Sequence, residues 1–247
     1  MRQKKYIFGY HTVSSALSVM PKEVLNICLQ DKQHDKRTAE VIALAKENRI
    51  SIRNLSRKDL EALLPPMSNH QGVVAEVEYE GVYSEEHLNK ILDRKGSDVL
   101  FLILDGVQDP HNLGACLRTA NASGVDAVIV PKDKACGLTP TVYKVASGAV
   151  GVTPLVQVTN LSRTIKMLKD NNVWVYGATE DADQTIYQTK LKPPIALVFG
   201  AEGKGLRRLT KESCDFLVGI PMKGVVGNLN VSVAVGVSLF EVFRQQL

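Results

Sequence analysis

The sequence of 247 residues has few cysteines, few aromatic residues and no long uninterrupted apolar run. The four cysteines stand far apart, without the close pairs typical of zinc or redox sites, at Cys28, Cys116, Cys136 and Cys214. We therefore expect reduced, mostly buried thiols and no metal. No apolar run approaches the roughly 18 residues of a membrane span, and "YIFGY" is too short and polar for a signal-peptide core. The sequence thus predicts a cytoplasmic protein that does not associate with membranes.

The charge is also close to balanced, with 30 Lys and Arg against 26 Asp and Glu and a net charge of +4. A surplus this small neither requires nor excludes nucleic acid as a partner. Hydrophobic residues make up 45% of the chain, which is typical of a soluble globular protein. The length suits one large α/β domain or two smaller ones, and we favour two.

The front of the chain, residues 1–78, alternates short apolar runs with helical patterns and predicts a small α/β domain. Its expected strands lie at 24–29, 50–55 and 72–78, and its clearest helix at 36–47. The tripeptide His70-Gln71-Gly72 is interpreted as a turn at the start of a strand. Residues 79–97 are charged, hold one short amphipathic helix, and are interpreted as a linker.

Residues 98–247 form the second predicted domain, an α/β unit with a mostly parallel sheet covered by helices on both faces. Strands are expected near 99–104, 126–130, 154–158, 173–178, 195–199 and 215–220, with helix-length segments between them. Ligands of such sheets gather outside the carboxyl ends of the strands. Three loops in those places have unusual sequences.

The first loop is "DPHNLGACLRTA", which follows the apolar run "VLFLIL". Either Asp109 or Asn112 can cap a helix that runs to Ser123. Helical side chains lean toward the N-terminus, so Arg118 can extend back over small residues toward Asn112. The alternative is a structural arginine paired with the strand-end carboxylate of Asp105.

The second loop, "LVFGAEGKGLRRLTKE", combines three glycines with a single carboxylate, Glu202. Glycine allows the backbone to approach a ligand closely. The helix that follows places three cations at spacings of three and four residues, which predicts one basic face suited to a phosphate backbone. These glycines and cations are Gly200, Gly203, Gly205, Arg207, Arg208 and Lys211.

The third loop begins "IPMKGVVGNLNVSVA". Ile220 and Met222 flank a proline in an extended piece, and Asn228 and Asn230 bracket Leu229. Alternating valines after Asn230 fit a strand, but the length of the segment and its ending "SLFEVFRQQ" favour a helix over 229–245.

Together the three motifs resemble the SpoU (TrmH) branch of the SPOUT RNA methyltransferases. The segments "YIFGYHTVSSAL" and "HQGVVAEV" are similar to the small substrate-binding, L30e-like domain of its members that methylate guanosine in 23S rRNA. The resemblance implies a C-terminal trefoil knot, a homodimer with the last helix at the interface, and S-adenosylmethionine as cofactor. The implied activity is methyl transfer to a ribose 2′-hydroxyl of RNA.

The resemblance also assigns roles to residues of the three motifs. Cofactor contacts fall at Gly200, Ile220, Met222 and Leu229. The catalytic set is Arg118, expected to stabilise the developing alkoxide, with Asn112, Glu202, Asn228 and Asn230 beside it. Two positions depart from the family pattern, because Asn228 stands where a serine is usual and Gly151 where many relatives have an acidic residue.

Those departures leave two alternatives to an rRNA methyltransferase. One is a non-catalytic RNA-binding relative that acts in ribosome assembly, and the other is the same chemistry on tRNA. Retention of Arg118, Glu202 and Asn230 argues against the first. An extra RNA surface on the front domain argues against the second, and we expect it near Lys4, Lys5, Arg53 and Arg57.

Overall fold

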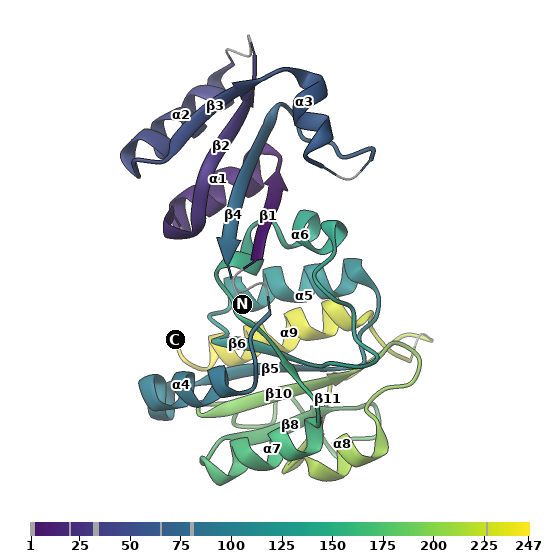
Figure 1. Ribbon diagram of the computed structural model, residues 1–247. Coiled ribbons are helices and arrows are strands. Elements are labelled where there is room, and N and C mark those ends of the chain that lie inside the picture. The colour runs from purple at the N-terminus through teal and green to yellow at the C-terminus, as the bar shows by residue number, and fades with distance from the viewer. Residues whose placement is uncertain (1–2, 20, 32–34, 65, 80–81, 226) are drawn as a thin grey trace. The chain divides into compact units, whose positions relative to one another are not determined.

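The computed structural model describes residues 3–19, 21–31, 35–64, 66–79, 82–225 and 227–247 (Figure 1). It divides into two compact units. The first comprises Met1–Gly81 with Ser147–Val152, and the second comprises Val82–Ala146 with Thr153–Leu247.

The first unit is a four-stranded sheet with three helices. Its strands have the order β1-β4-β2-β3, with β4 antiparallel to both neighbours and β2 parallel to β3. The elements are β1 (Gln3–Phe8), α1 (Tyr10–Val19), η1 (Pro21–Glu23), β2 (Val24–Gln30), α2 (Lys36–Glu47), β3 (Ser51–Leu55), α3 (Arg57–Ala62) and β4 (Val73–Tyr79). The strands and the helix predicted between residues 24 and 78 are confirmed. The turn is also confirmed, and in it the amide of Gly72 donates to His70 Nδ1 at 3.0 Å.

Side-chain caps begin two of these helices. Asp35 accepts a hydrogen bond from the Thr38 amide at 2.7 Å at the start of α2, and Ser56 accepts one from the Asp59 amide at 3.2 Å at the start of α3. Each cap satisfies a backbone donor that the first helical turn leaves without a partner. Apolar residues of helices and strands then fill the core, among them Val13, Leu17, Ile27, Val41, Leu60 and Val74.

The second unit is a seven-stranded sheet of order β7-β6-β5-β10-β8-β11-β9, and every strand pair described in it is parallel. Its strands are β5 (Leu100–Asp105), β6 (Ala127–Pro131), β7 (Leu155–Val158), β8 (Trp174–Ala178), β9 (Gln184–Thr185), β10 (Ile195–Gly200) and β11 (Phe216–Gly219). All six strands predicted here are present, which confirms the mostly parallel α/β fold. The two-residue β9 was not predicted.

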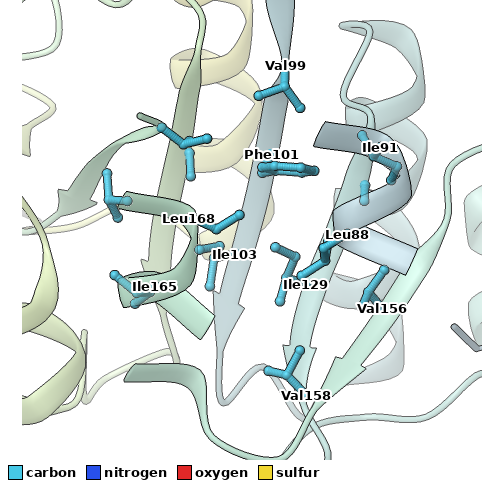
Figure 2. Packing of buried hydrophobic residues seen from close by; sticks show 14 of the residues in the cluster. Leu88, Ile91, Val99, Phe101, Ile103, Ile129, Val156, Val158, Ile165 and Leu168 are labelled. Carbon is cyan, nitrogen blue, oxygen red and sulfur yellow. The ribbon is translucent and has the colours of Figure 1, made fainter. Parts of the chain in front are cut away.

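Helices cover both faces of this sheet (Figure 1). The helices of this unit are α4 (Glu86–Lys95), α5 (Pro110–Ala122), α6 (Pro140–Ala146), α7 (Leu161–Asp170), α8 (Arg208–Ser213) and α9 (Val231–Arg244), with the short turn η2 (Gly96–Asp98). The short turn η3 (Ala149–Gly151) falls within the first unit. On one face, α4 and α7 pack on alternate residues of β5, such as Phe101 and Ile103 (Figure 2). Helices α5 and α9 pack against each other and cover the other face.

Helix α4 lies in the segment interpreted as a linker. Its apolar residues Leu88, Ile91 and Leu92 are buried in the same core as Phe101 and Ile165 (Figure 2). The amphipathic pattern of this helix therefore serves to cover the sheet of the second unit.

Helix α9 confirms the helical interpretation of 229–245 and shows that the strand alternative is wrong. Near its C-terminus, the Glu241 carboxylate accepts hydrogen bonds from Arg244 and Gln245, and these bonds lower its pKa to about 2. Gln245 in turn accepts from the Leu191 amide at 2.9 Å and donates to the Thr189 carbonyl at 3.1 Å. The end of the chain is thus fixed to the segment before β10. Of the helices described, none has the length and apolarity to cross a membrane.

Candidate functional site

A pocket of about 500 Å³ lies among the loops that follow β8, β10 and β11. It is lined by residues 178–181, 199–206 and 227–231, with Lys211, Val218, Ile220, Met222 and Ala234. The four residues expected to bind the cofactor, Gly200, Ile220, Met222 and Leu229, all line it. So do Glu202, Asn228 and Asn230 of the expected catalytic set.

Glycine is needed where the loop after β10 closes on itself. A Cβ atom on Gly200 would lie 2.0 Å from the carbonyl carbon of Gly205, so no other residue fits without moving the backbone. The Gly205 amide donates to the Ala201 carbonyl at 2.9 Å, and Gly203 and Gly205 have φ values of +72° and +61°. Such φ values favour glycine. The loop therefore has one tight shape, with its backbone against the pocket.

Three of the predicted catalytic residues form hydrogen bonds with one another around Glu202 of this loop. The Asn112 Nδ2 group donates to Glu202 Oε1 at 2.8 Å, and Asn230 Nδ2 donates both to Asn112 Oδ1 at 3.0 Å and to Glu202 Oε1. They come from α5, the loop after β10 and the start of α9. We call Asn112, Glu202 and Asn230 the amide–carboxylate cluster.

The N-terminal ends of α5 and α9 position two members of this cluster. Asn230 caps α9, where its Oδ1 accepts from the Ser232 amide at 2.9 Å. Asp109 caps α5 by accepting from the His111 amide at 3.0 Å, so of the two predicted caps Asp109 is confirmed. Asn112 as the cap is wrong, because it lies inside the first turn, where its buried side chain turns toward Glu202.

Arg118 lies further along α5, and its side chain is exposed to solvent. Six residues of helix place it about 9 Å beyond Asn112 along the axis. It is not among the residues that line the pocket of its own chain. The carboxylate of Asp105 is bound by Arg207, so Asp105 does not need Arg118 as its structural partner.

The basic face predicted around α8 is balanced by carboxylates. Arg207 starts α8 as its N-cap residue, and the two other cations lie within the helix. Each of the three cations is in an ion pair, which reduces its charge toward a phosphate backbone. These ion pairs are Arg207 with Asp105, Arg208 with Glu212 at 2.8 Å and Lys211 with Asp181 at 3.6 Å.

Sequence reasoning missed the polar segment after β8, which contributes Thr179, Glu180 and Asp181 to the pocket. Asn228 Nδ2 donates to Glu180 Oε1 at 2.9 Å across the pocket mouth. The signal was available, because "TEDAD" directly follows a predicted strand at its carboxyl end. The segment holds no glycine or asparagine motif, so its sequence pattern does not single it out.

The buried thiol near the cluster is not a nucleophile. Burial, with a smaller contribution from the charge of Glu202, raises the pKa of Cys116 to about 12. A thiol with this pKa stays protonated at neutral pH, and only the thiolate is reactive. All four cysteines are free, and the described residues contain no group of three His, Cys, Asp or Glu side chains able to hold a metal.

With this geometry established, comparison with known proteins gives the class. Residues 99–240 match the model of the SpoU rRNA Methylase family, and residues 6–80 match a domain described as RNA 2′-O ribose methyltransferase substrate binding. The chain belongs to the SpoU rRNA methylase family. The family and the enzyme class predicted from the three motifs are therefore confirmed.

Individual relatives are similar over the whole length. The chain is 51% identical over 246 residues to the 23S rRNA (guanosine-2′-O-)-methyltransferase RlmB of Pseudomonas putida, covering 100% of this chain and 98% of the relative. A solved RNA 2′-O ribose methyltransferase superposes with a TM-score of 0.76 at 26% identity, covering 98% and 89% of the two chains. AviRb from Streptomyces viridochromogenes, solved in complex with the cofactor AdoMet, superposes with a TM-score of 0.79 at 23% identity, covering 98% and 90%.

Proposed function

We propose that this protein transfers a methyl group from S-adenosylmethionine to the ribose 2′-hydroxyl of a guanosine in 23S rRNA. The observation that carries the proposal is the 51% identity to RlmB over both parts of the chain, including the front unit. A relative that shared only the catalytic unit would support the chemistry but not the choice of RNA.

The pocket suits S-adenosylmethionine in size and chemistry. Its volume of about 500 Å³ lies within the roughly 300–1,000 Å³ of small-molecule sites. The glycine loop offers backbone groups, and Ile220, Met222 and Leu229 offer apolar contacts. Glu180 at the same pocket provides negative charge that complements a cationic ligand, whereas Asp181 is paired with Lys211. When bound, S-adenosylmethionine supplies an electrophilic methyl group on a sulfonium centre.

The ribose 2′-oxygen would form its bond to the methyl carbon as the bond between that carbon and sulfur breaks, and the hydroxyl proton would pass to solvent water. Arg118 stabilises the negative charge that develops on the ribose oxygen in this step. A guanidinium is effectively always protonated in proteins, so Arg118 serves as an electrostatic partner and not as the base. Fixed positive charge beside a developing alkoxide lowers the barrier without reorganisation at the moment of reaction. Arg118 is exposed on α5, where an RNA substrate can reach it.

The amide–carboxylate cluster orients the ribose. Glu202 Oε1 already accepts from two asparagine amides, so its position is fixed by residues of two other segments. Holding two reacting groups in alignment removes a large part of the activation barrier of a bimolecular displacement. Asn112 is a buried member of the cluster, so it acts through its hydrogen bonds to Glu202 and Asn230.

We also propose that the protein is a homodimer that pairs through α9. This helix exposes apolar side chains seven and three residues apart, Val233, Phe240 and Phe243, which are 50%, 48% and 42% exposed. Such spacing forms one stripe along a helix. Helix α5 packs on α9, so this pairing brings Arg118 toward the dimer interface.

The chain after β11 is proposed to form the trefoil knot by passing through the segment between β8 and β10. Three hydrogen bonds support this path. Asn228 binds Glu180 at the start of that segment, and Gln245 binds Leu191 and Thr189 near its end.

The front unit is proposed to be an L30e-like domain that contacts RNA. Arg53 lies on the sheet-edge strand β3 and is exposed. Lys4 is near Glu76 at 3.5 Å, and Arg57 is paired with Glu61 at 2.9 Å, so Arg53 is the stronger candidate for a phosphate contact. The side chain of Lys5 lies outside the described residues. A role on ribosomal RNA also supports the cytoplasmic location expected from the sequence.

The function is tested by incubating the protein with labelled S-adenosylmethionine and RNA from a strain that lacks the gene. We expect label in 23S rRNA, at a ribose of guanosine, and none in tRNA. Label in tRNA alone would show that the protein catalyses the same reaction on tRNA and not on 23S rRNA. Cofactor binding without transfer to either RNA would favour the non-catalytic alternative.

Asn228→Ser tests whether the departure in the third motif affects catalysis. We expect activity equal to or higher than that of the natural protein, because serine is the usual family residue and the hydrogen bond lost, to Glu180, is exposed to solvent and contributes little. Steady-state methylation rates measure the effect. A loss of more than about tenfold, with an unchanged melting temperature, would show that this asparagine has its own role.

A further inference from the structure

The carboxylate of Asp105 is buried completely at the end of the central strand β5. A buried charge without a partner costs several kcal/mol, so its partner must be fixed closely. That partner is Arg207, 102 residues later, which supplies its backbone amide at 3.1 Å, its Nε at 2.5 Å and its Nη2 group. All three donors come from one residue.

Asp105 also lies beside the residue at which the loop after β10 begins. In the pairing of β5 with β10, Gly200 lies opposite Asp105. The loop therefore leaves the sheet beside Asp105 at Gly200 and returns to the carboxylate of Asp105 at Arg207. Both ends are fixed to one residue, while the bond from Gly205 to Ala201 closes the middle.

This loop is the wall of the pocket and also carries Glu202 of the amide–carboxylate cluster. Arg207 itself does not line the pocket. We propose that Asp105 and Arg207 are positioning residues, whose ion pair holds the loop in the shape that binds S-adenosylmethionine. The inference rests on the proposed function, because it takes this pocket as the cofactor site.

A preorganised loop binds its ligand without first losing conformational entropy. Without the guanidinium, the return of the loop keeps the bond from the residue 207 amide to Asp105, the hydrogen bonds of the loop itself and the amides around Glu202, but it loses the two side-chain donors to Asp105. Arginine is needed because a planar guanidinium offers several donors to one carboxylate, whereas a lysine ammonium is a point charge. The defect should therefore appear in cofactor affinity first.

The test compares Arg207→Gln with Arg207→Lys and with the neighbour Arg208→Gln as matched control. Arg208 is 77% exposed and pairs with Glu212 within its own helix, so its loss leaves the loop unchanged. Calorimetry with S-adenosylmethionine is expected to show Kd raised about tenfold in Arg207→Gln, about threefold in Arg207→Lys and unchanged in Arg208→Gln. Steady-state kinetics are expected to show the same order in KM for the cofactor, with kcat within about threefold of the natural protein.

An unchanged Kd in folded Arg207→Gln would overturn the proposal. If Arg207→Gln does not fold, the test uses folded Arg207→Lys instead. An unchanged Kd in that variant would also overturn the proposal. Ala234→Phe tests separately whether this pocket is the cofactor site. The larger side chain fills the pocket from α9 without touching the ion pair. Natural affinity in folded Ala234→Phe would mean that the cofactor binds elsewhere. Lost affinity in Ala234→Phe together with natural affinity in Arg207→Gln would overturn the positioning role alone.

Discussion

Arg118→Ala is expected to lower the rate of methyl transfer to 23S rRNA by about a hundredfold to a thousandfold, the usual cost of removing a donor to a developing oxyanion. Binding of S-adenosylmethionine should stay within about twofold, because Arg118 does not line the pocket of its own chain. The melting temperature is measured in parallel, so that a loss of rate can be separated from a loss of folded protein.

The measurement is single-turnover transfer of labelled methyl at saturating cofactor, with calorimetry for affinity. Arg118→Lys keeps a positive charge and should recover part of the rate. Arg94→Ala, an exposed arginine in the last turn of α4, is the control for loss of a surface cation. Turnover within tenfold of the natural protein in Arg118→Ala would remove this residue from the chemistry.

Gly200→Ala is expected to abolish detectable binding of S-adenosylmethionine. The new Cβ would stand 2.0 Å from the Gly205 carbonyl carbon, a contact that only a backbone shift can relieve. That shift displaces the loop that forms the pocket wall and carries Glu202. We expect the free energy of unfolding to fall by about 1–3 kcal/mol, as for overpacked core positions.

Calorimetry, at a temperature where the variant is folded, measures cofactor binding, and urea unfolding measures the free energy of unfolding. Gly137→Ala is the control, because its Cβ would enter open space and its φ is not in the left-handed region. It should change neither affinity nor stability by a measurable amount. A folded Gly200→Ala that binds the cofactor as tightly as the natural protein would show that the loop shape does not matter for binding.

The centre of the sheet could be predicted because its strands are buried on both faces. Strands β5 and β10 are nearly continuous apolar runs, and each is followed directly by a polar loop. The two-residue β9 was missed because Gln184 and Thr185 are too few for any period to appear. Helix α9 was ambiguous because alternating valines fit a strand, and only packing on α5 decides the matter.

The site was predictable only as far as its motifs reach. Glycine, asparagine and glutamate at strand ends pointed to Gly200, Glu202 and Asn230, which do line one pocket. Pairings between distant residues leave no local pattern. The ion pair from Arg207 to Asp105 joins positions 102 apart, so Arg207 was assigned to a basic face for RNA.

The pairing of β5 with β10 has a consequence for how the protein is made. Ile195 lies opposite Leu100, so one edge of β5 stays open while the ribosome adds the residues between them. An unpaired apolar strand edge invites aggregation, and long-range pairings form slowly. Since residues between 178 and 234 line the pocket, a nascent chain gains no protection from its cofactor until residue 234 has been added. A chain truncated before residue 195 should therefore accumulate in inclusion bodies and bind to chaperones.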